Sequence, residues 1–277
     1  MKKNFMVIDV GLCHDCNNCF MACKDEHVDN DWPGYTAPQP RHGHRWINIE
    51  RRERGQYARN DVAYMPTPCQ HCQVAHCQQA APEAVTIRPD GIVMIDAKKA
   101  KDNAALVGSC PFGAIYWNEE ASVGQKCTMC AHLLDSKDWK PGMPRCVHSC
   151  PTGAMEFYEM EPEEFEKMAK ERGLEGYRSN ELKNQPQVRY KNLHKFTKNF
   201  VTAGVLVNGD CFENATVSLK DAKGAAIATQ KTNFFGEFKF DGLENGNYAV
   251  DVDAAGKKAS LKATVDNQSL NLGFVKL

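Results

Sequence analysis

Thirteen cysteines are spread over 277 residues, and twelve of them fall into closely spaced groups. The tightest group has the spacing Cys13-x2-Cys16-x2-Cys19-x3-Cys23. In a run of this kind, three thiolates bind one iron–sulfur cubane and the fourth reaches a neighbouring cubane. The pattern therefore indicates a protein that moves electrons. The other grouped cysteines are Cys69, Cys72, Cys77, Cys110, Cys127, Cys130, Cys146 and Cys150.

A repeated unit indicates that one further cluster site has been lost. Cys110 and Cys150 are each followed by proline and, one residue later, by Gly-Ala, and a third copy of the unit begins with Ala81-Pro82. Counting back from Cys110 with the spacing of the first run leads to three more positions without sulfur. The missing thiolates would together hold a single cubane, so the loss of one whole cluster explains them. The four positions are Ala81, Ala100, Asn103 and Leu106.

The exchange of fourth ligands between paired runs assigns the remaining cysteines to three [4Fe-4S] clusters. Proline after Cys110 and after Cys150 fits this assignment, because its fixed φ and missing N–H suit a chain that turns away from a cluster. The expected ligand sets are Cys13, Cys16, Cys19 and Cys150 for cluster 1, Cys23, Cys127, Cys130 and Cys146 for cluster 2, and Cys69, Cys72, Cys77 and Cys110 for cluster 3.

Other uses of the cysteines fit the pattern less well. Cys-x2-Cys is equally a zinc spacing, so a module held together by three zinc ions, each bound by four cysteines, is the rival interpretation. Four cysteines within eleven residues, together with the Cys-Pro repeats, favour clusters. A disulfide framework is disfavoured, because the chain is long enough to build a core without one. Cys211 lies apart and is expected to be a small buried residue. We expect the nearby histidines to surround the clusters or lie at the surface: His14, His71, His76, His132 and His148.

Charge and hydropathy limit the possible partners. The formal net charge is −1 and the pI is near 6.7, which argues against a nucleic-acid partner. No apolar run has the length that a bilayer requires, so we expect no direct insertion into a membrane. Residues 1–10 contain two lysines but no signal-peptide pattern, and they are predicted to form a first strand. The expected location is the cytoplasm, with export beside a signal-bearing partner as the alternative.

The fold class predicted from these patterns is α+β, with a ferredoxin-like multi-cluster domain followed by a small all-β sandwich. Residues 1–160 carry all the predicted ligands, and an insertion at 29–68, rich in Arg, His, Trp and Pro, is a candidate interface. Residues 84–88 and 92–95 are predicted to form a hairpin. Residues 161–199 are predicted to contain a capped helix over 162–172 and then an extended connector.

From residue 200 to residue 277 the pattern changes to short strands separated by turn signals such as Asn208-Gly209 and Asn245-Gly246. Seven such strands indicate a sandwich. The run Thr232–Phe240 resembles transthyretin-like or Cna-B-like repeats, and no catalytic constellation accompanies it. The expected strands cover residues 201–207, 215–220, 225–231, 237–240, 248–253, 257–265 and 270–275.

Over residues 1–160 the chain resembles the iron–sulfur subunits of molybdopterin enzymes in the dimethyl-sulfoxide-reductase superfamily. The missing fourth ligand set and the sandwich narrow the resemblance to subunits of transhydroxylases that act on polyphenols. The segments that carry it are Cys13–Phe20, Gly43–Trp46, Lys126–Leu134 and Asn233–Phe240.

The resemblance implies a larger catalytic partner subunit that holds molybdenum, molybdopterin and the substrate pocket. This chain would then be an electron-transfer subunit with no catalytic residue of its own. Hydroxyl transfer between polyphenols is redox-neutral overall, so a reductive dehydroxylase or another molybdopterin oxidoreductase is an alternative. A free-standing polyferredoxin is a third possibility, although the insertion and the sandwich count against it.

Overall fold

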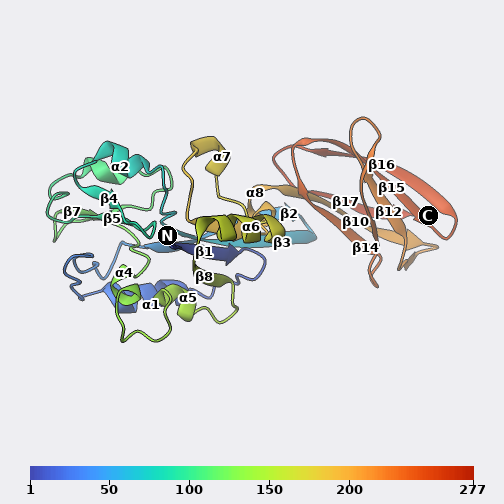
Figure 1. The fold of residues 1–277 in the computed structure, drawn as a ribbon. Coiled ribbons are helices and arrows are strands. Elements are labelled where there is room, and N and C mark those ends of the chain that lie inside the picture. Colours follow the sequence, from blue (N-terminus) through green and yellow to red (C-terminus); the bar gives the residue numbers. More distant parts are fainter. The chain divides into compact units, whose positions relative to one another are not determined.

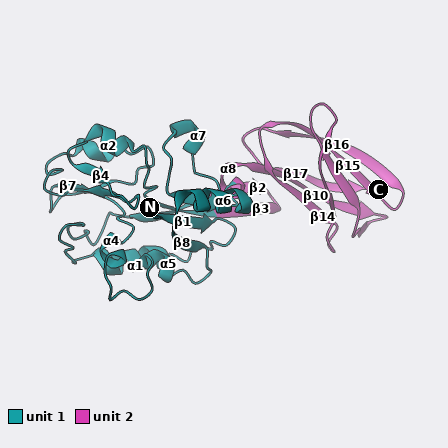
Figure 2. Cartoon of the chain, in the orientation of Figure 1, with its two compact units in different colours: residues 1–50, 64–193 teal, residues 51–63, 194–277 magenta.

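The computed structural model describes residues 1–277, and the chain forms two compact units. Unit 1 consists of Met1–Glu50 and Tyr64–Leu193, and unit 2 consists of Arg51–Ala63 and His194–Leu277 (Figure 2). Helices and sheets mix in unit 1, whereas unit 2 is almost entirely β (Figure 1). None of the helices has both the length and the apolar character needed to cross a membrane.

A three-stranded sheet forms the middle of unit 1. Strand β1 (Lys3–Asp9) lies between β8 (Met155–Met160), which is antiparallel to it, and β9 (Val188–Lys191), which is parallel. The first strand agrees with the prediction for residues 1–10. Strand β9 does not, because residues 174–199 were expected to form an extended connector. Val188 and Tyr190 of β9 are fully buried, and the backbone of β9 pairs with that of β1. These contacts stabilise a strand in a polar segment whose sequence shows little periodicity.

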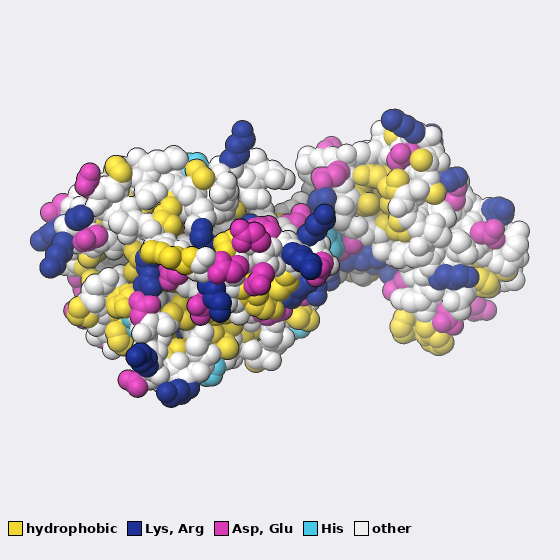
Figure 3. Space-filling model, viewed as in Figure 1, with side chains coloured by type: hydrophobic (Ala, Val, Ile, Leu, Met, Phe, Trp, Pro, Cys, Tyr) yellow, Lys and Arg dark blue, Asp and Glu magenta, His cyan; other side chains and the backbone are white.

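Helix α6 (Pro162–Arg172) covers this sheet and confirms the predicted helix. The ring of Phe165 stacks on that of Phe5, with centroids 3.7 Å apart. Gly173 ends the helix in the left-handed conformation, at φ 63°. Acidic and basic side chains gather over the region of α6 in Figure 3, as expected for a helix with one buried face.

Around the sheet, unit 1 consists of short elements joined by tight turns. Strands β4 (Val85–Ile87) and β5 (Val93–Ile95) form the predicted hairpin, and β6 (Tyr116–Asn118) pairs with β7 (Val123–Gln125). Strands β2 (Ile47–Gln56) and β3 (Arg59–Pro68) pair in a hairpin whose tip belongs to unit 2. The short helices are α1 (Asn18–His27), α2 (His76–Ala80), α3 (Ala105–Gly108), α4 (Ala131–Leu134), α5 (Arg145–His148), α7 (Ser179–Leu182) and, in unit 2, α8 (His194–Thr197).

Unit 2 contains two four-stranded sheets that enclose one hydrophobic core. In the first sheet β10 pairs with β11, β14 and β17, and in the second the order is β13-β12-β15-β16. Each of the seven strands predicted from the sequence is present, and β11 is additional. The strands are β10 (Asn199–Val207), β11 (Asp210–Cys211), β12 (Thr216–Lys220), β13 (Ala226–Lys231), β14 (Glu237–Leu243), β15 (Gly246–Ala254), β16 (Lys257–Val265) and β17 (Leu270–Lys276).

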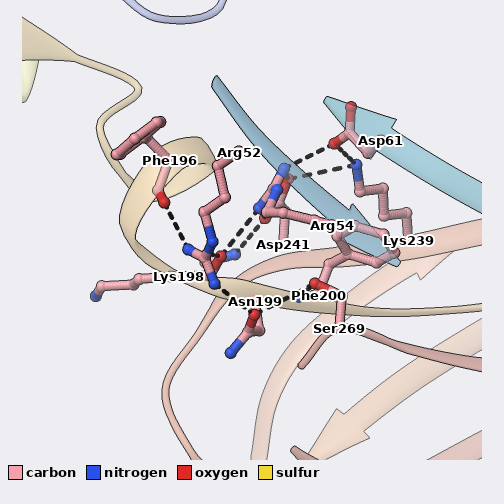
Figure 4. Close-up of polar contacts among 11 residues, drawn as sticks. Arg52, Arg54, Asp61, Phe196, Lys198, Asn199, Phe200, Lys239, Asp241 and Ser269 are labelled. Carbon is pink, nitrogen blue, oxygen red and sulfur yellow. Dashed lines mark hydrogen bonds and ion pairs between the residues drawn. The ribbon is translucent and has the colours of Figure 1, made fainter. Parts of the chain in front are cut away.

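A buried arginine fixes the tip of the β2–β3 hairpin to the sandwich (Figure 4). The side chain of Arg54 is 1% exposed, and its guanidinium forms ion pairs of 2.7 Å with both Asp61 and Asp241. It also donates a hydrogen bond to the carbonyl of Lys198 and lies against the ring of Phe200. Burial disfavours ionisation of Asp241, but Arg54, together with Lys239 and the backbone N–H of Gly242, holds the pKa of that carboxyl below its usual value.

We predict that Arg54→Met lowers the free energy of unfolding by about 3 kcal/mol, because it leaves two carboxylates without their buried partner. Scanning calorimetry of the full chain should show a transition at lower temperature. Lys258→Met is the matched control, because it removes a 3.6 Å ion pair between two exposed side chains. Equal effects of the two substitutions would contradict the role given to Arg54.

Candidate functional site

The first group of thiols lies where the loop after β1 enters α1. Asp15 and Asn17 adopt left-handed conformations, with φ of 56° and 61°, and these turns bring the loop back on itself. Cys19 faces the thiols of its own run and that of Cys150, which follows α5. Burial first, and then the nearby Cys13, Cys150 and Cys16, raise the pKa of Cys19 to about 12.

The second group joins α1 to the two segments that contain α4 and α5. Cys19 and Cys23 are four residues apart in one helix, so both lie on the face that is buried. Cys23, Cys127, Cys130 and Cys146 line a single cavity, which His27 and Trp46 also border. Burial raises the pKa of Cys130 to about 12, and burial and the neighbouring Cys130, Cys127 and Cys23 raise the pKa of Cys146 well above its usual value.

The third group comes from the loop after β3, from α2 and from the turn after α3. Burial and the nearby Cys69, Cys110 and Cys77 raise the pKa of the Cys72 thiol to about 12. The pKa of Cys77 is raised to about 11, by burial and by Cys69 and Cys110. Cys110 is thus close to the other three, although it follows Cys77 by more than thirty residues.

The surroundings of these thiols suit iron–sulfur clusters. All the cysteines are free of disulfides. The four thiols of the second group line one small cavity. Backbone N–H groups point at sulfur, from His71 to Cys69 at 3.5 Å and from Met129 to Cys127 at 3.3 Å. Such donors stabilise thiolates and the clusters that they bind.

The electrostatic effects of thiols in one group on thiols in another show which of the three groups are neighbours. Cys19 of the first group raises the pKa of Cys23 and Cys146 in the second, where burial is the larger cause. Cys69 of the third group likewise raises the pKa of Cys127 in the second, after burial. The three groups therefore form a row, with the second in the middle.

Hydrophobic packing occupies the region where the fourth ligand set is missing. Ala81, Ala100 and Leu106 are at most 8% exposed and belong to one core cluster with Val85, Val93, Ile115 and Val123. A Cβ added to Gly124 would lie only 3.2 Å from Ile115 and 3.6 Å from Leu106. Close packing of this kind leaves little room for a cubane.

Several polar residues near the thiols were not found from the sequence. His27 is 1% exposed, and its Nε2 lies 3.9 Å from the sulfur of Cys130. Lys126 is buried and donates hydrogen bonds to the carbonyls of Val93 and Cys127, and Asn184 donates one to the sulfur of Cys72. Of these, only Lys126, directly before Cys127, is next to a recognisable motif.

The five histidines close to the cysteine motifs differ in their surroundings. His14 and His148 are exposed, whereas His71 is fully buried and accepts a hydrogen bond from the backbone of Val93. His76 is half-buried. His132 is buried beside Glu26, at 2.9 Å.

The prediction for Cys211 was wrong, because this residue is exposed. It ends the two-residue strand β11, directly after the turn at Asn208 and Gly209. Such a short edge strand leaves its side chains outside the core.

Comparisons with known proteins show what this chain is similar to. Residues 60–160 match the model of a 4Fe-4S dicluster domain, and residues 208–272 match that of an SdrD B-like domain. The chain is 56% identical over its full length to the whole pyrogallol hydroxytransferase small subunit of Pelobacter acidigallici. It is 30% identical to the thiosulfate reductase electron transfer subunit PhsB of Salmonella typhi, over 64% of this chain and 86% of that one. The beta subunit of formate dehydrogenase from Megalodesulfovibrio gigas is 30% identical, over 62% of this chain and 82% of that one.

We predict that Cys110→Ser removes the cluster held by Cys69, Cys72 and Cys77, because position 81, where a nearer fourth ligand would stand, is alanine. Electron paramagnetic resonance of the reduced complex should lose one set of signals and keep the others. Cys211→Ser is the control, since its thiol belongs to none of the groups. Loss of the signals of the cluster at Cys13 instead would show that the assignment is wrong.

Proposed function

The chain belongs to the family of pyrogallol hydroxytransferase small subunits, and from that premise we propose that it carries three [4Fe-4S] clusters beside a catalytic subunit that holds molybdenum and molybdopterin. Its role is electron transfer, as in the related subunit of thiosulfate reductase. The observation that carries the proposal is the gathering of twelve thiols into three groups of four without any disulfide. The proposed domain that holds them, residues 1–160, is ferredoxin-like.

The proposed ligand sets are those expected from the spacing. Each bound cluster would supply a site that takes up or releases one electron. The chain's own residues hold the thiolates in place, donate N–H groups to sulfur and bury most of the second group. The sets are Cys13, Cys16, Cys19 and Cys150; Cys23, Cys127, Cys130 and Cys146; and Cys69, Cys72, Cys77 and Cys110.

The first group is the proposed end of the row that faces the catalytic subunit. Cys16 is exposed, and the side chains of Leu12 and Met21 nearby are 45% and 60% exposed. Exposed apolar side chains beside a redox centre suit an interface through which electrons pass. The insertion at 29–68 also borders this end of the row. Its Arg45 lies over the ring of Phe20, 4.0 Å from the ring centre, and Phe20 directly follows Cys19 of the first group.

The substrate pocket and all catalytic groups belong, in this proposal, to the partner. The complex would act on polyphenols in the cytoplasm, and the sandwich would serve in docking or in structure. Transfer of a hydroxyl group between trihydroxybenzenes needs no net supply of electrons. The clusters would then set or restore the oxidation state of the metal, rather than deliver electrons at every turnover.

A reductive polyphenol dehydroxylase is the second candidate. The observation in its favour is that all three ligand sets are intact, as expected where electrons flow at each turnover. The full-length identity to a hydroxytransferase subunit favours the first candidate.

An anaerobic assay of the purified complex on pyrogallol separates the two candidates. We predict that a trihydroxybenzene isomer forms at the same steady rate with and without reduced viologen, and that no viologen is oxidised in proportion to product. Heat-inactivated complex provides the control for direct reaction of viologen with substrate. Turnover that stops without the donor, with two viologens oxidised per product, would assign the complex to the dehydroxylases.

A further inference from the structure

A segment that the sequence predicted to be a connector lies against the third group of thiols. We call residues 177–187 the strap. On one side the backbone N–H groups of Gln73 and Val74, which follow Cys72, donate hydrogen bonds of 3.0 and 3.1 Å to the carbonyls of Gln185 and Asn184. The strap is therefore held by the loop that supplies one thiol of this group.

The other side of the strap reaches the turn after Cys110. Arg178 donates a hydrogen bond of 3.1 Å to the carbonyl of Pro111, and its guanidinium lies 6.0 Å from the ring centre of Phe112. The ring of Tyr177 is also 6.0 Å from that of Phe112. The strap thus connects the turns that follow two thiols of the same group, Cys72 and Cys110.

Asn184 is the part of the strap that touches sulfur. Its side chain is fully buried, and Nδ2 donates a hydrogen bond of 3.2 Å to Sγ of Cys72. Its Oδ1 has no hydrogen-bond partner. A buried amide is costly unless it is bonded, so the bond to sulfur holds Asn184 in this orientation. The bond lowers the pKa of Cys72, although burial keeps that pKa raised overall.

A hydrogen bond to a ligand sulfur stabilises negative charge on the cluster, and the reduced cluster carries one more negative charge than the oxidised one. The third group lies at the end of the row, beyond which the hydrophobic core replaces a fourth site. An electron that arrives here has no further cluster to reach.

We propose that Asn184 is a positioning residue that raises the reduction potential of the cluster bound by Cys69, Cys72, Cys77 and Cys110. A cluster held by these four residues would then keep an electron more readily than it would without the hydrogen bond. This inference rests on the proposed three-cluster function. It assigns to the strap a chemical role beyond its packing.

The test is a redox titration of the assembled complex, followed by electron paramagnetic resonance. Asn184→Leu keeps a side chain of similar volume without the donor, and it should shift one of three midpoint potentials to a lower value. Asn184→Asp replaces the donor by a carboxylate and should shift the same potential further in the same direction. The other two potentials should stay where they are in the unaltered complex.

Two controls separate the hydrogen bond from packing of the strap. Asn180→Ala changes an exposed residue of the same segment and should have no effect. Tyr177→Leu removes the ring contact with Phe112 without changing any charge, so it should leave the potential unchanged. A shift with Tyr177→Leu as large as that with Asn184→Leu would overturn the proposal, and so would an unchanged potential in both Asn184 variants.

Iron analysis keeps this test distinct from that of the proposed function. About twelve irons per chain, at four per cubane, are required in the unaltered complex, and a different number there contradicts the three-cluster proposal itself. Loss of roughly four irons in both Asn184 variants counts against the inference alone, because it would assign the residue to cluster assembly rather than to the potential.

Discussion

Each group of four thiols draws its members from segments that are far apart in the chain, and the arrangement of unit 1 depends on this constraint. Cys150 joins a loop near the N-terminus, and Cys23 of α1 joins Cys127, Cys130 and Cys146. Burial raises the pKa of most of these thiols, so four of them together are stable as thiolates only when a metal centre balances their charge. Folding of unit 1 and loading of its clusters are therefore expected to be coupled.

If three clusters are bound as proposed, the hydrophobic core around Ala81, Ala100 and Leu106 ends the row inside the protein. Small and branched apolar side chains fill that region, and their burial stabilises it without a metal centre. A relay that ends in this way can hold an electron but cannot pass it on to another cluster of the chain. This property suits a reaction in which substrate and product have the same overall oxidation state.

Local spacing was sufficient to predict much of the molecule. The strands of the sandwich follow from alternating residues between Asn-Gly and similar turns, and helix α6 follows from its proline, its apolar stripe and Gly173. The cysteine spacing was sufficient to propose three ligand sets, and the structure places the same thiols near one another. That they bind clusters stays a proposal.

Long-range contacts explain what the sequence did not predict. Strand β9 lacks a clear periodic pattern, and it is stabilised by pairing with β1 from the other end of the unit. Asn184 and Cys72 are 112 residues apart, so no motif could connect them. The sequence also did not predict that Arg54, in the tip of the β2–β3 hairpin, pairs with Asp241, a carboxylate 187 residues further on.

Iron-edge anomalous diffraction from crystals of the assembled complex tests the central claim most directly. We expect three compact iron peaks in this subunit, each surrounded by one of the proposed sets of four cysteines, and no peak among Ala81, Ala100 and Leu106. The middle peak should lie between Cys23 and Cys127. A fourth peak in that hydrophobic core, or peaks at the zinc edge in place of the iron peaks, would contradict it.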